Sequence, residues 1–93
     1  MPYFLLFYDL VDDYVARRTE FRQEHLRLVR EASARGEILL AGALAEPADR
    51  AVLAFRCAGR ETPEAFAKQD PYVVNGLVKK WEVRLWNNVV ENA

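Results

Sequence analysis

Three basic side chains share one side of a segment with helical periodicity. Arg18, Arg22 and His25 are separated by four and three positions, and residues at these spacings project from the same side of an α-helix. His25 is the single histidine of the chain, and an imidazole gains or loses a proton near neutral pH. The two guanidinium groups suit a carboxylate, a phenolate or an enolate. This spacing predicts an anion site beside a general acid–base group.

Each of these residues also has a structural interpretation. His25 lies on the apolar stripe with Phe21 and Leu28, where a histidine can simply hydrogen-bond a backbone carbonyl. The arginines could pair with glutamates on a solvated helix face, because residues 14–35 hold six arginines and three glutamates. The pattern on this helix alone leaves both interpretations open.

Composition narrows the class of protein. The 93 residues predict a single domain over 1–93, and 52% of them are hydrophobic. A net charge of −1 does not favour binding to nucleic acid or to an anionic membrane.

One cysteine, Cys57, and one histidine cannot make a zinc site of the usual ligand number. No cofactor motif is present either, so we expect neither a metal nor a cofactor. The lone thiol and the short first apolar run predict a cytoplasmic protein.

Periodicity and turn residues predict the secondary structure. We expect strands over 3–8, 37–44, 51–56 and 80–89 and a long helix over 14–35. Gly36 follows the last periodic residue of that helix and is predicted to have a positive φ. Thr62 and Pro63 predict the N-cap and first position of a short helix, and Asp70 before Pro71 predicts a second helix start.

This β-α-β-β-α-β order predicts an α+β, ferredoxin-like fold, with a four-stranded antiparallel sheet and helices on one face. The other sheet face needs cover, because the first strand carries aromatic residues on both faces and Trp86 lies on the mixed face of the last strand. A partner's sheet would supply that cover, so we expect a homodimer that forms through the sheet. A monomer with one wetted face is the alternative.

Several short motifs fall in order along these elements. The segment from Arg18 to Leu26 has the form R-x3-R-x2-H-L, Gly36 is followed by Leu40-Ala41-Gly42, and Asp70-Pro71-Tyr72 precedes Gly76-Leu77. In this combination the chain resembles the YciI-like (YCII-related) family of the dimeric ferredoxin-like α+β barrel superfamily.

The resemblance implies a His–Asp pair in a cleft, with His25 and Asp70 as catalytic residues. Arg22, Arg18, Gly42 and Tyr72 are then the expected ligand-binding residues of a small-molecule site. A carboxylate that accepts a hydrogen bond from one ring nitrogen fixes the tautomer and leaves the other nitrogen as a base. We therefore expect His25 and Asp70 at hydrogen-bonding distance, roughly 2.6–3.2 Å.

Two functions are consistent with such a site. The first is a cofactor-independent enzyme that performs acid–base isomerisation or elimination on a small oxygenated anion, as the resemblance implies for a few relatives that act on oxygenated or chlorinated rings. The second is a non-catalytic binding or sensory dimer that uses the same cleft. The sequence alone does not separate them.

Overall fold

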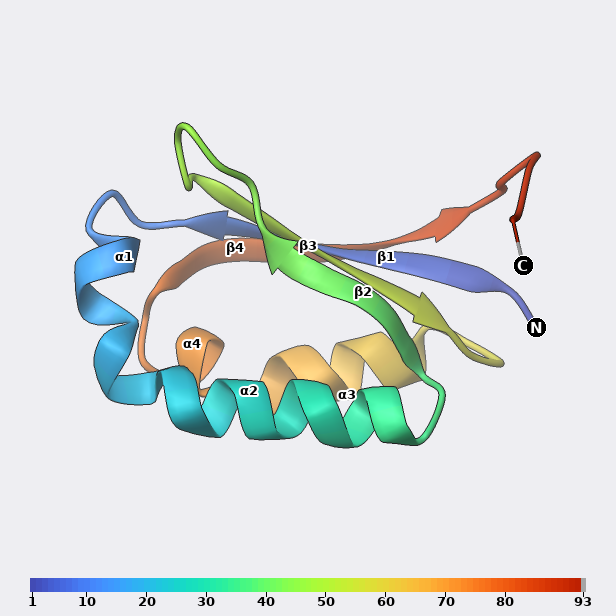
Figure 1. Cartoon of the computed structure of the whole chain (residues 1–93), viewed down its shortest axis with the longest axis horizontal. Coiled ribbons are helices and arrows are strands. Elements are labelled where there is room, and N and C mark those ends of the chain that lie inside the picture. Colours follow the sequence, from blue (N-terminus) through green and yellow to red (C-terminus); the bar gives the residue numbers. More distant parts are fainter. Residues whose placement is uncertain (93) are drawn as a thin grey trace.

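Four strands form one antiparallel sheet in the computed structural model, which describes residues 1–92 (Figure 1). The strands are β1 (Tyr3–Leu10), β2 (Ile38–Ala43), β3 (Arg50–Arg56) and β4 (Val78–Trp86), in the spatial order β2-β3-β1-β4. β1 pairs with β3 and with β4, and β2 pairs with β3, all antiparallel. The predicted ferredoxin-like α+β architecture is confirmed.

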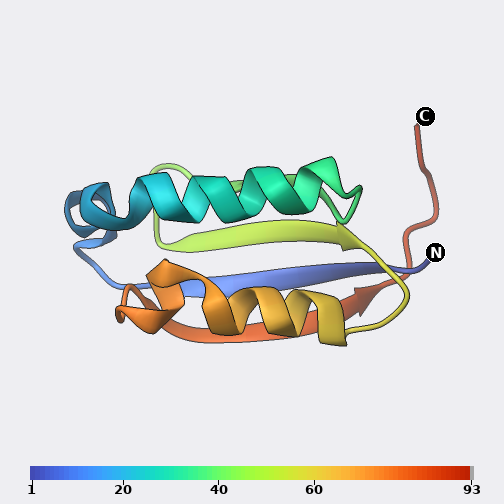
Figure 2. The ribbon, with the colours of Figure 1, turned by 90° about the horizontal axis from the view of Figure 1, so that it is seen from below.

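The helices cover one face of this sheet (Figures 1 and 2). They are α1 (Tyr14–Arg17), α2 (Thr19–Ala34), α3 (Glu61–Gln69) and α4 (Pro71–Val74). Alternation along β1 sends Phe4, Leu6 and Tyr8 into the core beneath the helices, where all three are buried. Leu5 and Phe7 point to the opposite face and are only half-buried. Within the described residues, that second face has no helix over it.

The first helical segment differs from its prediction as one continuous helix. It divides at Arg18 into α1 and α2, and the Phe21 N–H bonds the Arg18 carbonyl, three residues back, at 2.9 Å. An i→i−3 bond tightens the chain locally. The division allows α1 to turn away from the axis of α2 (Figure 1).

Other element boundaries also differ from their predictions. Thr62 is not the N-cap of α3, because that helix already begins at Glu61, after Arg60, and no side chain caps it. β4 ends at Trp86 rather than Val89. Trp86 is paired with Tyr3, the first residue of β1, so β1 offers no further residues with which β4 could pair.

Within residues 1–92, every helix is too short or too polar to span a lipid bilayer.

The predicted positive φ of Gly36 is confirmed, at 80°. A Cβ added there would meet nothing within 4 Å, so a substitution is opposed by backbone strain and not by a clash. Asparagine tolerates the left-handed conformation better than a β-branched residue does.

Gly36→Val should therefore lower the free energy of unfolding by about 1–2 kcal/mol, measured by urea denaturation. Gly36→Asn is the matched control and should lose clearly less. Equal stability of the Val and Asn variants would show that the backbone at this position is not strained.

Candidate active site

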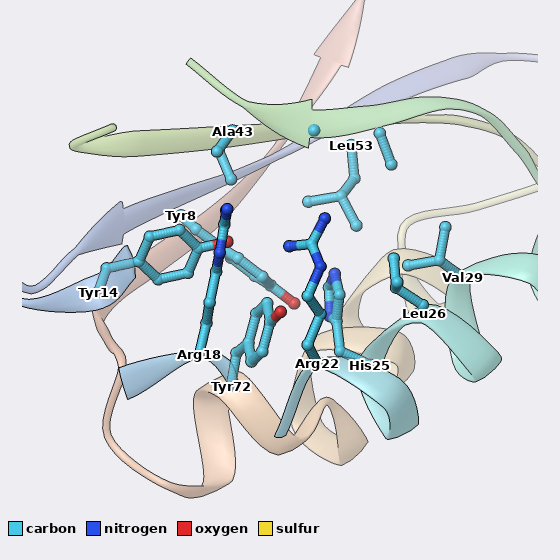
Figure 3. A pocket seen from close by; sticks show the side chains of 13 residues that line it. Tyr8, Tyr14, Arg18, Arg22, His25, Leu26, Val29, Ala43, Leu53 and Tyr72 are labelled. Carbon is cyan, nitrogen blue, oxygen red and sulfur yellow. The ribbon is translucent and has the colours of Figure 1, made fainter. Parts of the chain in front are cut away.

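A cavity of about 140 Å³ lies beneath the helices, between α1, α2 and α4 on one side and β2 and β3 on the other (Figure 3). It includes five of the six expected site residues, which come from three separate segments of the chain: Arg18, Arg22, His25, Gly42 and Tyr72. Asp70, the sixth, lies behind His25 and is fully buried. The fold thus brings all six positions together.

Short side chains on the sheet leave this space open. Ala41 and Ala43 of β2 and Ala51 of β3 line the cavity on the helix-facing side. A methyl group extends too little to reach α2, so a space remains where larger residues would have filled the core. Gly42 pairs with Val52, whose side chain belongs to the opposite face, so Gly42 contributes backbone to the cavity.

His25 and Asp70 make the expected side-chain contact. Nδ1 of His25 lies 2.9 Å from Oδ1 and 2.9 Å from Oδ2 of the carboxylate. His25 reaches the carboxylate from α2, and Asp70 stands at the junction of α3 and α4. The imidazole side chain keeps 14% of its surface exposed and lines the cavity, whereas the carboxylate has none exposed.

Asp70 also accepts hydrogen bonds from two other groups. The Tyr8 hydroxyl donates to Oδ2 at 2.8 Å, and the Tyr72 N–H donates to Oδ1 at 3.0 Å as the helix cap predicted before Pro71. An ionised carboxylate can only accept hydrogen bonds, so the nitrogen of His25 that contacts it must donate. We therefore assign a proton to Nδ1 of His25. In the neutral ring Nε2 then carries no proton, and it makes no hydrogen bond within residues 1–92.

Tyr72 holds the imidazole in its plane. The two rings are stacked, with centroids 3.9 Å apart and 14° between the planes. Tyr14 packs edge-on against Tyr72, with centroids 5.6 Å apart, and the Arg18 guanidinium lies 5.3 Å from the centre of the Tyr14 ring. Tyr72 therefore packs against the flat face of the imidazole, while Asp70 contacts its edge, and Tyr14 supports Tyr72 from behind.

Arg18 and Arg22 have no carboxylate within 4 Å among the described residues, whereas Arg17, Arg27 and Arg35 each form an ion pair. Both unpaired arginines line the cavity, so the interpretation of these two as members of surface Arg–Glu pairs is wrong. The cavity wall is therefore electropositive. The described chain brings no three His, Cys, Asp or Glu side chains together as a metal site.

Tyr8 was not among the sequence candidates. Its position on the buried side of a strand was readable, and a buried tyrosine hydroxyl generally requires a partner. That this partner would be Asp70, 62 positions away, depends on the pairing of the whole sheet. Burial, followed by the charge of Asp70, raises the pKa of Tyr8 far above its ordinary value of 10.0, so its hydroxyl stays a donor.

Tyr8→Phe should lower the free energy of unfolding at neutral pH by about 1.5–3 kcal/mol, because it removes a donor from a buried carboxylate. Since the pKa of Tyr8 is raised by folding, its neutral hydroxyl stabilises the fold fully below the unfolded value of about 10, and this contribution is lost as the pH rises above it. Denaturation curves from pH 7 to 11 should give a shallower alkaline decline for the variant. Identical curves would contradict the assignment.

Comparisons with known proteins agree with this architecture. Among solved structures the chain is similar to 5-chloro-2-hydroxyhydroquinone dehydrochlorinase (TftG) from Burkholderia phenoliruptrix AC1100, solved in complex with 2,5-dihydroxybenzoquinone. The TM-score is 0.78 and the sequence identity is 17%, over 94% of this chain and 95% of that chain. The two proteins therefore share a fold. No curated protein sequence matches the chain. The family model of the YCII-related domain matches residues 1–87, and the chain therefore belongs to the family of YCII-related domains.

Proposed function

We propose that the protein is a cofactor-independent enzyme that uses His25 as a general acid and base on a small oxygenated anion. One observation carries the proposal: Nδ1 of His25 lies 2.9 Å from both oxygens of a buried carboxylate, while the imidazole lines a cavity. A base that is oriented by a second group and faces a cavity is the usual arrangement for proton transfer.

In the proposed reaction, Nε2 of His25 takes a proton from the bound compound. Asp70 stabilises the imidazolium that forms and keeps the ring in its orientation. The electron pair left on the substrate is delocalised onto an oxygen, and the Arg22 guanidinium stabilises the resulting oxyanion. Return of the proton to a different atom completes an isomerisation, and departure of a leaving group with its electron pair completes an elimination.

The charge of the cavity supports this substrate class. Two guanidinium groups without carboxylate partners favour an anion. The structural neighbour is named as a dehydrochlorinase and was solved with a dihydroxybenzoquinone, which suggests oxygenated single rings as the first compounds to test.

His25→Gln should reduce turnover of such a compound by about 10²–10⁴-fold, the usual contribution of general acid–base catalysis. Suitable assays are chloride release from 5-chloro-2-hydroxyhydroquinone and solvent deuterium exchange into hydroxylated rings, followed by NMR. Asp70→Asn should also impair turnover, since an amide does not stabilise an imidazolium as a carboxylate does. Arg30→Gln, on the same helix outside the cavity, is the control and should retain activity.

Binding of 2,5-dihydroxybenzoquinone without turnover of any compound would favour the alternative of a binding or sensory protein. Full activity of His25→Gln would contradict the proposed role of the histidine directly.

We further propose that the protein is a homodimer formed through the open sheet face. The register places several apolar side chains on the face opposite the helices, among them Leu5, Phe7, Leu40, Val52 and Trp86. Leu40 is 75% exposed and Trp86 47%. A second sheet packed on this face would bury these side chains.

Sedimentation should give a mass near twice the chain mass of 10.7 kDa. Leu40→Glu should shift the equilibrium toward monomer without unfolding the chain, because that side chain is already exposed in a single protomer. Val15→Glu, at an exposed position on α1, is the control and should remain dimeric. A wild-type mass near 10.7 kDa at micromolar concentration would exclude the dimer.

A further inference from the structure

We propose that the Tyr72 hydroxyl, together with the guanidinium groups of Arg22 and Arg18, forms an oxyanion subsite that selects single-ring ligands bearing an ionised oxygen. The inference deepens the proposed function and rests on it in one respect, that the ligand held here is the compound on which His25 acts.

The first observation is a buried hydroxyl without a partner. Tyr72 is 1% exposed, and its hydroxyl makes no hydrogen bond of good geometry with any described residue, although the Arg22 guanidinium lies close enough to lower the pKa of that hydroxyl. It is the one buried side-chain polar atom in residues 1–92 of which this is true. The Tyr8 hydroxyl, equally buried, is satisfied by Asp70. An unsatisfied buried hydroxyl destabilises a fold, so its retention points to a partner that arrives with the ligand.

The second observation is the position of that hydroxyl. Tyr72 stands between Arg18 and Arg22 in the close view, with its hydroxyl directed into the cavity (Figure 3). Neither arginine has a carboxylate partner among the described residues. The Asp70 carboxylate cannot neutralise them, since it is fully buried behind His25 and occupied by three donors. One neutral donor and two cations therefore converge on one region.

Tyr72 acts in this subsite as a donor and not as a base. Burial is the main reason that its pKa is raised, to about 12, and the neighbouring Tyr14 adds to the effect. Arg22 and Arg18 act in the opposite direction but do not overcome burial. The hydroxyl therefore keeps its proton throughout the neutral range and can donate it in a hydrogen bond to an anionic oxygen.

The stacking of Tyr72 on His25 fixes the subsite relative to the base. The two rings are stacked with centroids 3.9 Å apart, so the position of one ring limits the position of the other. An oxyanion bound at Tyr72 would place the neighbouring ligand atoms beside the imidazole. Leu26, Val29 and Leu53 supply apolar walls, and the cavity of about 140 Å³ is close to the roughly 150 Å³ that accommodates benzene. These features fit one ring with an ionised oxygen.

The test uses benzoate as the anionic probe and benzamide as its neutral counterpart, with binding to the full chain followed by NMR titration. Wild-type protein should bind benzoate at millimolar concentration, more tightly than benzamide. Tyr72→Phe keeps the stacked ring and removes only the hydroxyl, so it should weaken benzoate binding about tenfold and reduce the preference over benzamide. Arg30→Gln removes a charge from α2, the helix that carries Arg22, at a position outside the cavity, and this variant should bind as wild type does.

A second measurement separates a ligand donor from a structural hydroxyl. Tyr72→Phe should raise the melting temperature by about 4–8 °C, because it removes an unsatisfied buried group, whereas Tyr8→Phe should lower it. Gain of stability with loss of benzoate preference is the expected result. Unchanged benzoate affinity in Tyr72→Phe, or absence of wild-type binding at millimolar benzoate, would overturn the subsite.

The two proposals can fail separately. If Tyr72→Phe loses benzoate preference while His25→Gln retains full turnover, the subsite stands and the acid–base role of His25 fails. If His25→Gln loses turnover while Tyr72→Phe binds benzoate normally, the subsite fails and the acid–base role stands.

Discussion

The buried carboxylate of Asp70 is the interaction on which the rest of the site depends. It has no exposed surface, so a charge there is tolerated only because three donors surround it. Those donors come from different parts of the chain: a hydroxyl from β1, an imidazole from α2 and a backbone N–H from α4. The carboxylate thus links α2 and α4 to β1 at one point. Loss of any one donor leaves a buried charge with less compensation.

The same carboxylate links stability to chemistry. Because it holds Nδ1 of His25, the ring presents its other nitrogen to the cavity, and the stacked Tyr72 keeps the ring from rotating. The cavity itself exists because the sheet offers alanines where a core would usually carry larger side chains. The core is therefore less tightly packed at the cavity, and the Tyr72 hydroxyl beside it has no hydrogen bond of good geometry with the described residues. Such local departures from good packing are typical of functional sites.

Much of this arrangement was predictable from sequence, for identifiable reasons. Helical spacing alone was enough to place Arg18, Arg22 and His25 on one side, and the Asp-Pro dipeptide was enough to predict the cap at Asp70. Gly36 was predicted from its position after a long helix. These are local features, decided within a few residues of chain.

Long-range features were harder to predict. The partnership of Tyr8 with Asp70 depends on strand pairing and joins residues 62 positions apart. The end of β4 was set by where its neighbour β1 begins, and not by its own apolar pattern. Pairing of His25 with Asp70 was expected from the family resemblance, since periodicity alone gave no reason to choose this carboxylate.

The most direct test of the account is the ¹⁵N spectrum of the single histidine, recorded at a pH where the ring is neutral. The network around Asp70 predicts a proton on Nδ1 with Nε2 unprotonated, and loss of that preference in Asp70→Asn. A wild-type ring that carries its neutral-form proton on Nε2, or a tautomer unchanged by Asp70→Asn, would contradict the claim that the buried carboxylate directs a base into the cavity.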